Sequence, residues 1–483
     1  MSRLVRRIVF IGVLCCGGLM SCSTRSVLRF EKFNASVGKG DYLSTIAAIK
    51  KQPKLYGKNN LFLYNIDVGA LYQYAGLFDS SAAYLLKAGR IYDDLFTRSV
   101  TNEAASLLTN DNIRPYRSKP YEIVLLHQFL QLDYLSMGQP DEALVEARAT
   151  QLLFNEWERK NAKENRYFTD GMFHYITSIV YDQEGQTDDA MISLYTAVRA
   201  FQQGPVALPP VLREYAGRML EKNNRGADAE KLGIRPKAVL KNEETGFHNE
   251  QTEIIVVGYA GKGPALIENQ WWGEWVRDGV MVLHHATSEG REETMAFPAP
   301  GLPRQELEKQ QRGEKTKSGT TVFIKVALPQ VKTFPSQTAF FTVRADENEP
   351  IQSYTINDLD KQAEKQLEDA KPSIIGRTVV RVVTRTIAAQ EAKKRMETNS
   401  ALLNLLINVG TDVVSAQLEK ADTRSCFFIP KTIQIARIPV KPGNHMVTIE
   451  ARDRNNAILN YKTFPAITLK PHEKRFVVYS SLR

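Results

Sequence analysis

Apolar residues recur at helical spacing through the first half of the chain. From Phe30 to about Leu232 they follow the 3.6-residue period of amphipathic helices, and polar stretches that contain glycine interrupt them. This pattern predicts a run of helices joined by turns. The stretch from Thr109 to Pro120 breaks the period and indicates a loop insertion, and Leu212 to Leu232 predicts a closing helix.

Three segments of this half share one pattern of small residues and tyrosines. In each, a tyrosine stands four residues before a glycine, and an alanine follows. The glycine allows a sharp bend between two helices, the alanine lets them approach closely, and the tyrosine fills the seam. The residues concerned are Gly69, Tyr72, Gly76 and Ala88, then Tyr134, Gly138 and Ala143, then Tyr181, Gly185 and Ala190.

These segments resemble the tetratricopeptide repeat, with a weaker match at Gly40 to Tyr42. Gly76 and Gly138 are 62 residues apart and Gly138 and Gly185 are 47 apart, whereas that family repeats every ~34 residues. The resemblance implies an irregular solenoid of helical hairpins that offers a concave face to a peptide or protein. The alternative is a helical layer that only supports the second half of the chain.

The second half carries short apolar and alternating runs typical of β-strands. Between strands, residues 288–319 are polar and predict a long exposed excursion. A helical insert of about 357–420 is predicted, with Asn357 capping a first helix that Pro372 ends, a second helix to Met396, and a third from Leu402 to Leu418. The predicted strands are 253–258, 280–284, 322–328, 338–345, 433–440, 445–450, 460–464 and 475–479.

These patterns predict an α+β chain of several domains. Residues 22–232 form the helical solenoid, 233–250 a polar linker, and 251–483 a β-rich domain that contains the helical insert. The glycine-rich stretch Gly258 to Pro264 is interpreted as a bent strand end, because no Ser or Thr and no helix follow its Gly-Lys pair as a phosphate loop requires.

The N-terminus has the features of an export signal. Arg3, Arg6 and Arg7 precede an apolar run from Ile8 to Leu19 that is too short to span a membrane. Leu19-Met-Ser-Cys22 resembles the bacterial lipobox, which implies removal of residues 1–21 and lipidation (palmitate among the acyl groups) of Cys22. Ser23 in place of aspartate implies the outer membrane. The alternative is an ordinary secretory signal with a chance cysteine.

Composition places the rest of the chain among globular proteins. The 483 residues are 43% hydrophobic and 24% charged, with a net charge of +9 and four cysteines. With the signal removed and Cys22 lipidated, only Cys426 remains, which excludes an intrachain disulfide. A basic body can be attracted to anionic lipid or peptidoglycan, or the excess charge can serve solubility alone.

Two clusters suggest ligand binding. Trp271, Trp272 and Trp275 can stack on sugar rings, although such a cluster more often covers a core. Arg377, Arg381 and Arg385 fall at i, i+4 and i+8 of a predicted helix and can bind a phosphate or carboxylate polymer, unless local acids such as Glu364 and Glu368 pair with them.

The seven histidines show no metal-binding spacing, and no nucleophile elbow or cysteine pair occurs. No metal or cofactor is therefore predicted, and a non-enzymatic binding role is favoured. A glycan hydrolase built on scattered carboxylates stays open as an alternative, because carboxylates far apart in sequence can meet in the fold.

The chain also resembles an uncharacterised family of bacterial outer-membrane lipoproteins with tetratricopeptide-like repeats at the front. The matching features are Gly261-Lys-Gly263-Pro264, Ile324 to Pro329, Arg377 to Arg381, and Ala421-Asp-Thr-Arg-Ser425 with Pro430. Cys426 stands where that family has tryptophan. The resemblance implies a lipid-anchored protein with its soluble body in the periplasm, and exposure at the cell surface stays open. We expect an adaptor or scaffold that binds another envelope protein and no nucleic acid, with peptidoglycan or glycan binding in support of wall synthesis as the alternative.

Overall fold

A computed structural model describes residues 24–98, 114–161, 170–234, 252–275, 280–286, 292–298, 322–396 and 420–483. Over these residues the protein is a mixed α/β structure. Cys22, residues 1–21, most of the predicted linker and the predicted helix from Leu402 to Leu418 lie outside them.

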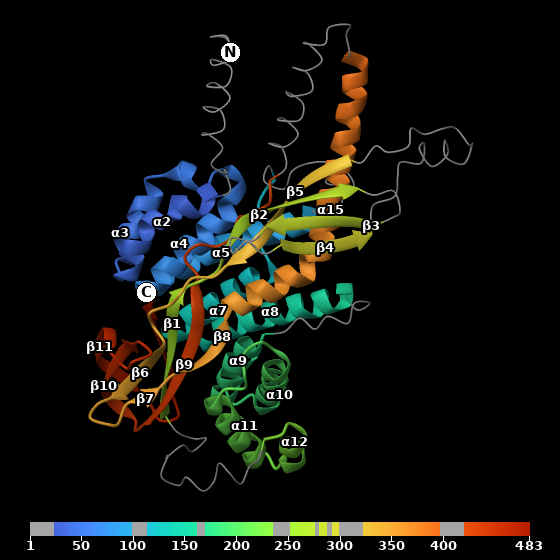
Figure 1. The fold of residues 1–483 in the computed structure, drawn as a ribbon. Coiled ribbons are helices and arrows are strands. Elements are labelled where there is room, and N and C mark those ends of the chain that lie inside the picture. Colours follow the sequence, from blue (N-terminus) through green and yellow to red (C-terminus); the bar gives the residue numbers. More distant parts are fainter. Residues whose placement is uncertain are drawn as a thin grey trace.

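The first half is helical, as predicted, and its helices pair as consecutive hairpins. In Figure 1 they follow one another from the blue end to the green end of the colour bar. The helices are α2 (Thr24–Gly38), α3 (Tyr42–Lys50), α4 (Leu61–Tyr74), α5 (Phe78–Arg98), α7 (Pro120–Ser136), α8 (Pro140–Asn161), α9 (Gly171–Gln183), α10 (Thr187–Gln203), α11 (Pro210–Lys222) and α12 (Gly226–Lys231), with 3-10 turns η1 (Pro53–Leu55) and η2 (Lys58–Asn60).

The turns between paired helices share one conformation. Gly76, Gly138 and Gly185 all have positive φ, at 76°, 72° and 71°. After each glycine a backbone N–H returns to the carbonyl of the repeat tyrosine, as in the 3.0 Å bond from Leu77 to Tyr72. This is the Schellman arrangement that ends a helix. The predicted sharp bends are therefore present at all three glycines.

The remaining repeat residues also lie in the helix–helix seams. A Cβ atom at Gly69 would lie 2.8 Å from Leu85 Cγ of the paired helix, so a small residue is required there. Ala88, Ala143 and Ala190 are fully buried. The three repeat tyrosines pack, partly buried, against the core, and the Tyr72 ring stacks on Tyr84 with centroids 5.5 Å apart.

The second half forms three four-stranded sheets. Sheet A has the order β12-β1-β9-β8, sheet B β4-β3-β2-β5, and sheet C β11-β10-β6-β7. The strands are β1 (Thr252–Lys262), β2 (Ala265–Trp275), β3 (Val280–Ala286), β4 (Glu292–Pro298), β5 (Val322–Lys332), β6 (Phe340–Ala345), β7 (Ile351–Gln352), β8 (Tyr354–Asp358), β9 (Pro430–Val440), β10 (Gly443–Arg452), β11 (Ile458–Leu469) and β12 (Lys474–Ser481).

Sheet A is the middle layer of the molecule. On β1, Ile255 and Val257 belong to the core shared with the helices, while Ile254 and Val256 belong to the core shared with sheet C. Successive side chains of a strand point to opposite faces, so a strand covered on both sides is apolar throughout. This explains the unbroken apolar run of β1, which pairs in parallel with β12 and antiparallel with β9.

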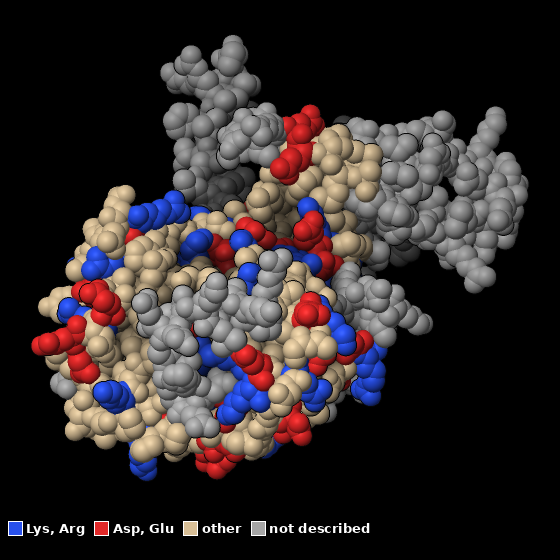
Figure 2. Space-filling view, turned by 90° about the horizontal axis from the view of Figure 1, so that it is seen from below, with Lys and Arg blue, Asp and Glu red and all other residues tan. Residues whose placement is uncertain are grey.

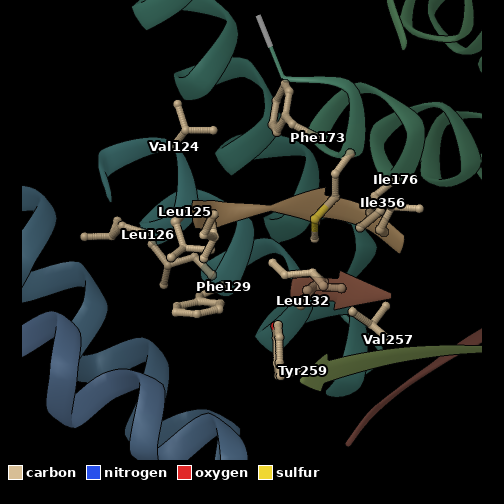
Figure 3. Close-up of a cluster of buried hydrophobic side chains, with 14 of the residues drawn as sticks. Val124, Leu125, Leu126, Phe129, Leu132, Phe173, Ile176, Val257, Tyr259 and Ile356 are labelled. Carbon is tan, nitrogen blue, oxygen red and sulfur yellow. The ribbon is translucent and has the colours of Figure 1, made fainter. Parts of the chain in front are cut away.

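The inner helices α4 and α7 are covered by sheet A. Figure 3 shows Phe129 and Leu132 of α7 beside Val257 and Tyr259 of β1. The Tyr259 hydroxyl donates to Gln73 Oε1 of α4 at 2.7 Å. The face that the repeat resemblance offered to a partner is thus filled by the chain itself. This observation supports the alternative in which the helical layer backs the second half.

Three expectations for the second half were wrong in detail. Helix α15 (Leu359–Met396) runs through Pro372 without a break. Its first turn is capped by Asp358, whose Oδ1 accepts from the Lys361 N–H at 3.2 Å, and Asn357 lies in β8. The predicted exposed excursion contains strand β4, which pairs with β3. Proline lacks only one backbone donor, so tertiary contacts can carry a helix past it.

Candidate functional site

A pocket of about 610 Å³ opens where four parts of the chain meet. Its walls are the segment Arg114 to Lys119 before α7, the segment Lys420 to Arg424 before β9, and the middle of α15. Leu266 of β2 and Ala327 and Pro329 of β5 add apolar side chains to its lining. We refer to it as the cationic pocket.

Basic residues dominate the described lining of this pocket. One acidic residue, Asp422, is among the lining residues that the structure describes. By contrast, Lys and Arg are interspersed with Asp and Glu over the face of the molecule seen in Figure 2. The basic lining residues are Arg114, Arg117, Lys119, Arg377, Arg381, Lys420 and Arg424.

Arg424 fixes the geometry of one wall. Its guanidinium binds Asp422 through two nitrogens, at 2.8 and 2.7 Å, and its Nη1 donates to the Arg114 carbonyl at 2.8 Å. Burial acts to raise the pKa of Asp422, but the hydrogen bonds and charge of Arg424 outweigh burial and hold that pKa below its usual value. Asp422 therefore stays ionised and compensates Arg424, so the pair contributes shape more than charge.

Lys119 joins the same wall to α7. Its ammonium donates to the Arg424 carbonyl at 2.7 Å and lies 3.6 Å from buried Glu122. The backbone N–H of Cys426 donates to the same carboxylate at 3.3 Å. The motif from Ala421 to Pro430 is therefore a segment that docks on the helical layer and carries Arg424 to the pocket.

The opposite wall comes from α15. Arg377 and Arg381 are one turn apart, and both line the pocket. Arg377 is exposed and Arg381 is 3% exposed. With exposed Arg117 across the pocket, this arrangement presents guanidinium groups from both sides. Guanidinium groups bind carboxylates and phosphates through paired hydrogen bonds, so the pocket has the chemistry of an anion-binding site.

Sequence reasoning found only part of this site. The helical spacing of α15 pointed to Arg377 and Arg381, while the side chain of Arg385 lies outside the described residues. The basic residues of the other walls are scattered through the sequence, and only the fold brings them to α15. Arg424 alone had a sequence signal, because it lies in the Ala421 to Pro430 motif.

A smaller pocket of about 240 Å³ adjoins the cationic one. The two pockets share Tyr116 and Arg117, and Phe62, Tyr92 and Trp157 line the smaller one. The shared residues place an aromatic cavity directly beside a concentration of positive charge. A ligand that carries an apolar group next to an acidic group fits this combination.

The tryptophans do not form one stacking platform. Trp271 and Trp272 are neighbours on β2, so their side chains point to opposite faces of sheet B. Trp271 is 5% exposed and packs on His285, with ring centroids 5.1 Å apart, whereas Trp272 is 40% exposed. The side chain of Trp275 lies outside the described residues. Trp271 thus behaves as a core residue, as the alternative interpretation expected.

The structure offers little for catalysis at Cys426. Its thiol is buried, and burial together with the nearby carboxylates of Glu122 and Asp67 raises its pKa well above the usual value, which disfavours the reactive thiolate. Within the described ranges, no group of His, Cys, Asp and Glu is arranged to hold a metal ion. The helices described here include none long and apolar enough to cross a membrane.

Comparison with known proteins adds no family. No protein-family model and no curated protein matches the chain. Among solved structures, the crystal structure of BtubC (BKLC) from P. vanneervenii aligns with 50% of this chain and 87% of its own, at 14% identity and a TM-score of 0.31. A superposition of that quality shows neither a shared fold nor a function. The resemblance to the lipoprotein family stays a prediction.

Proposed function

We propose that the protein is a non-enzymatic adaptor, anchored to the outer membrane through lipid on Cys22, that binds an acidic segment of another envelope protein in the cationic pocket. Its helical hairpins are of the tetratricopeptide type and back the β-rich half. The observation that carries the proposal is the meeting of Arg377 and Arg381 with Arg117 around one pocket.

Two further features favour a protein ligand. Asp422 fixes the side chain of Arg424 on one wall of the pocket, and a wall that is already ordered lowers the cost of binding. The adjoining aromatic cavity at Trp157 suits an apolar side chain beside the acidic ones. Peptidoglycan also carries carboxylates, and it is the competing ligand that the experiment must separate.

The binding test uses the mature chain and a fluorescent hexaglutamate peptide with one central leucine. We expect binding that weakens as salt rises, and a loss of about tenfold or more for Arg377→Ala, because each charge-assisted hydrogen bond contributes ~1.5–3 kcal/mol. Arg454→Ala is the matched control, since this exposed arginine lies far from the pocket in sequence and does not line it.

The outcome also decides between ligands. The peptidoglycan alternative would be favoured if soluble wall fragments displace the peptide and if Arg377→Ala weakens the binding of those fragments. Equal binding of both probes by the wild type, Arg377→Ala and Arg454→Ala would contradict the pocket altogether. In cells, a photoreactive residue at the exposed pocket residue Ser373 is expected to give a discrete protein adduct that disappears when Cys22→Ala removes the anchor.

A further inference from the structure

A second groove, separate from the cationic pocket, runs along the outer edge of sheet A. Strand β12 ends the sheet, since the strand order is β12-β1-β9-β8. A groove of about 890 Å³ lies beside it and is lined by Arg475 and the five consecutive residues Phe476 to Ser480. Consecutive residues of one strand all line a groove when the strand faces it with its edge.

The hydrogen bonds of β12 show which backbone groups face this groove. Glu253 N–H donates to the Glu473 carbonyl, and Lys474 N–H turns the other way, to Gln183 Oε1. In a parallel ladder the N–H and C=O of one residue point to the same side, and the side alternates along the strand. The backbone groups of Phe476, Val478 and Ser480 therefore point away from β1 and into the groove.

These outward groups are unpaired within the described part of the chain. Among the described strands β12 pairs with β1 alone, and no other described hydrogen bond uses the N–H or C=O of Phe476, Val478 or Ser480. The three residues are only 3%, 9% and 5% exposed. An unpaired strand edge is a template for a further strand, so these three positions offer their donors and acceptors to an extended chain in the groove.

The walls of the groove have different origins. One wall comes from the helical layer, with Tyr42 and Tyr74, and the other from β11, the end strand of sheet C, with Phe464 and Ile467. Arg483 joins the walls at one end, because its guanidinium donates to the Gly38 carbonyl at 2.8 Å and to the Leu459 carbonyl at 3.0 Å.

We propose that this groove takes an extended segment of a partner protein, which pairs with β12 as a fifth strand of sheet A. A strand placed there would direct alternate side chains to the tyrosines of one wall and to Phe464 and Ile467 of the other. About five residues, or ~17 Å of extended chain, would satisfy the three outward positions.

Because the edge of β12 lies between two walls, an extended segment fits the groove better than a second folded copy of the protein. A second copy would have to bring the edge of its own folded sheet between the two walls of the groove, and its covering layers would collide with both. A single extended chain has no such layers. Among the described lining residues, Arg475 is paired with Glu473, and Lys39 and Lys462 outnumber the acidic residue Asp41, so an apolar segment with acidic flanks is the best match.

Amide hydrogen exchange of the mature protein gives the first test. The probe is a peptide whose five central residues alternate between valine and tyrosine, with one glutamate added at each end. In the free protein the amides of Phe476, Val478 and Ser480 should exchange faster than those of Val477 and Tyr479, which bond to β1. The peptide should slow the exchange of the Phe476, Val478 and Ser480 amides and leave the exchange of the Val477 and Tyr479 amides unchanged. Equal, slow exchange of both sets in the free protein would show that the edge is already paired, which overturns the proposal.

A pair of variants gives the second test. Val478→Pro removes one outward N–H and keeps the ladder to β1, since proline is tolerated at the open side of an edge strand. We expect it to bind the peptide at least about tenfold more weakly than Val478→Ala, which keeps the N–H and equally loses the valine side chain. Equal binding by the two variants would contradict strand pairing, and if Val478→Pro fails to fold, the exchange data still decide. Because the glutamates of the peptide also suit the cationic pocket, the two variants are compared in an Arg377→Ala background, and the groove then stands or falls separately from that pocket.

Discussion

At the scale of single residues, buried acids hold the second half of the chain on the helices. Asp67 of α4 is fully buried, and its Oδ1 accepts from the N–H groups of Phe427 and Phe428, at 2.8 and 3.2 Å. Its Oδ2 accepts from the Tyr56 hydroxyl at 2.8 Å. Asp67 is the one charged residue of α4, so the sequence showed an anomaly and gave no indication of the partner, which lies 360 residues away.

Asp67 should make the stability of the protein depend on pH. Burial raises its pKa from 3.8 to about 7, although these hydrogen bonds oppose the rise. Between those values the unfolded chain has released the proton that the folded chain still holds, so the free energy of unfolding falls as pH rises through this window, by up to ~1.4 kcal/mol per pH unit. Urea unfolding of wild type and Asp67→Asn from pH 4 to 8 measures the difference.

The variant is a close match because asparagine keeps an oxygen for the two backbone N–H groups and gains an amide that can donate to Tyr56. We expect the variant to gain stability relative to the wild type as pH rises from 4 to 7, and the gain to level off above pH 7. Stability curves that stay parallel across this range would show that Asp67 is already ionised at pH 4.

At the scale of helices and strands, periodicity and turn residues correctly predicted the features that depend on local sequence, such as the turns that end helices. The turns at Gly76, Gly138 and Gly185 form where a positive φ and a helix end coincide. The errors came where packing overrides local preference. Helix α15 passes Pro372 because its flanks pack on β5 and α7, and β4 forms because β3 offers an open edge. The cationic pocket escaped prediction for the same reason, since its walls meet only through tertiary packing.

The small residue at Gly69 should be required for the α4–α5 hairpin. Gly69→Ala places a Cβ 2.8 Å from Cγ of Leu85, which is fully buried and cannot move aside. Overpacking of this kind costs ~1–3 kcal/mol, and the higher helix propensity of alanine returns at most about 1. We expect a net loss of about 1 kcal/mol or more in chemical denaturation.

Gly226→Ala is the matched control for this substitution. Gly226 begins α12, has no atom within 4 Å of the added Cβ, and lacks a positive φ. The same change there should leave stability within about 0.5 kcal/mol or raise it slightly. A similar loss at both glycines would mean that the hairpin seam tolerates a methyl group.

At the scale of the whole molecule, the helical half and sheet A share one core. Phe476 and Val478 of β12 pack in the same cluster as Phe129 of α7 and Leu71 of α4. The domain boundary expected near residue 233 separates the two kinds of secondary structure, but the hydrophobic core crosses it. The sequence pattern gives the period of each helix or strand but does not indicate which helix faces pack on which sheet faces. The core shared by the helical half and sheet A could therefore not be predicted.

Deletion of residues 474–483 should therefore unfold more than a sheet edge. We expect the full chain to melt in one transition, followed by circular dichroism and by tryptophan fluorescence. The truncated chain should lose that transition and bind a hydrophobic dye, because the inner face of α4 and α7 becomes uncovered. A helical signal that melts as in the full chain would show that the helical half folds by itself. Replacing the exposed turn at Asn455 and Asn456 with glycines is the control, and should preserve the single transition.

The position of β12 in sheet A also affects the order in which the chain can fold during synthesis. A chain made from its N-terminus delivers the ten helices that the structure describes first, then β1, and only after the other described strands β12, which lies beside β1 and over the helices. Until β12 joins β1, the part of the inner helical face that Phe476 and Val478 cover lacks its native partner. The core that the helices share with sheet A is therefore complete only when β12 is in place, and a product truncated before residue 474 should depend on a chaperone to stay soluble.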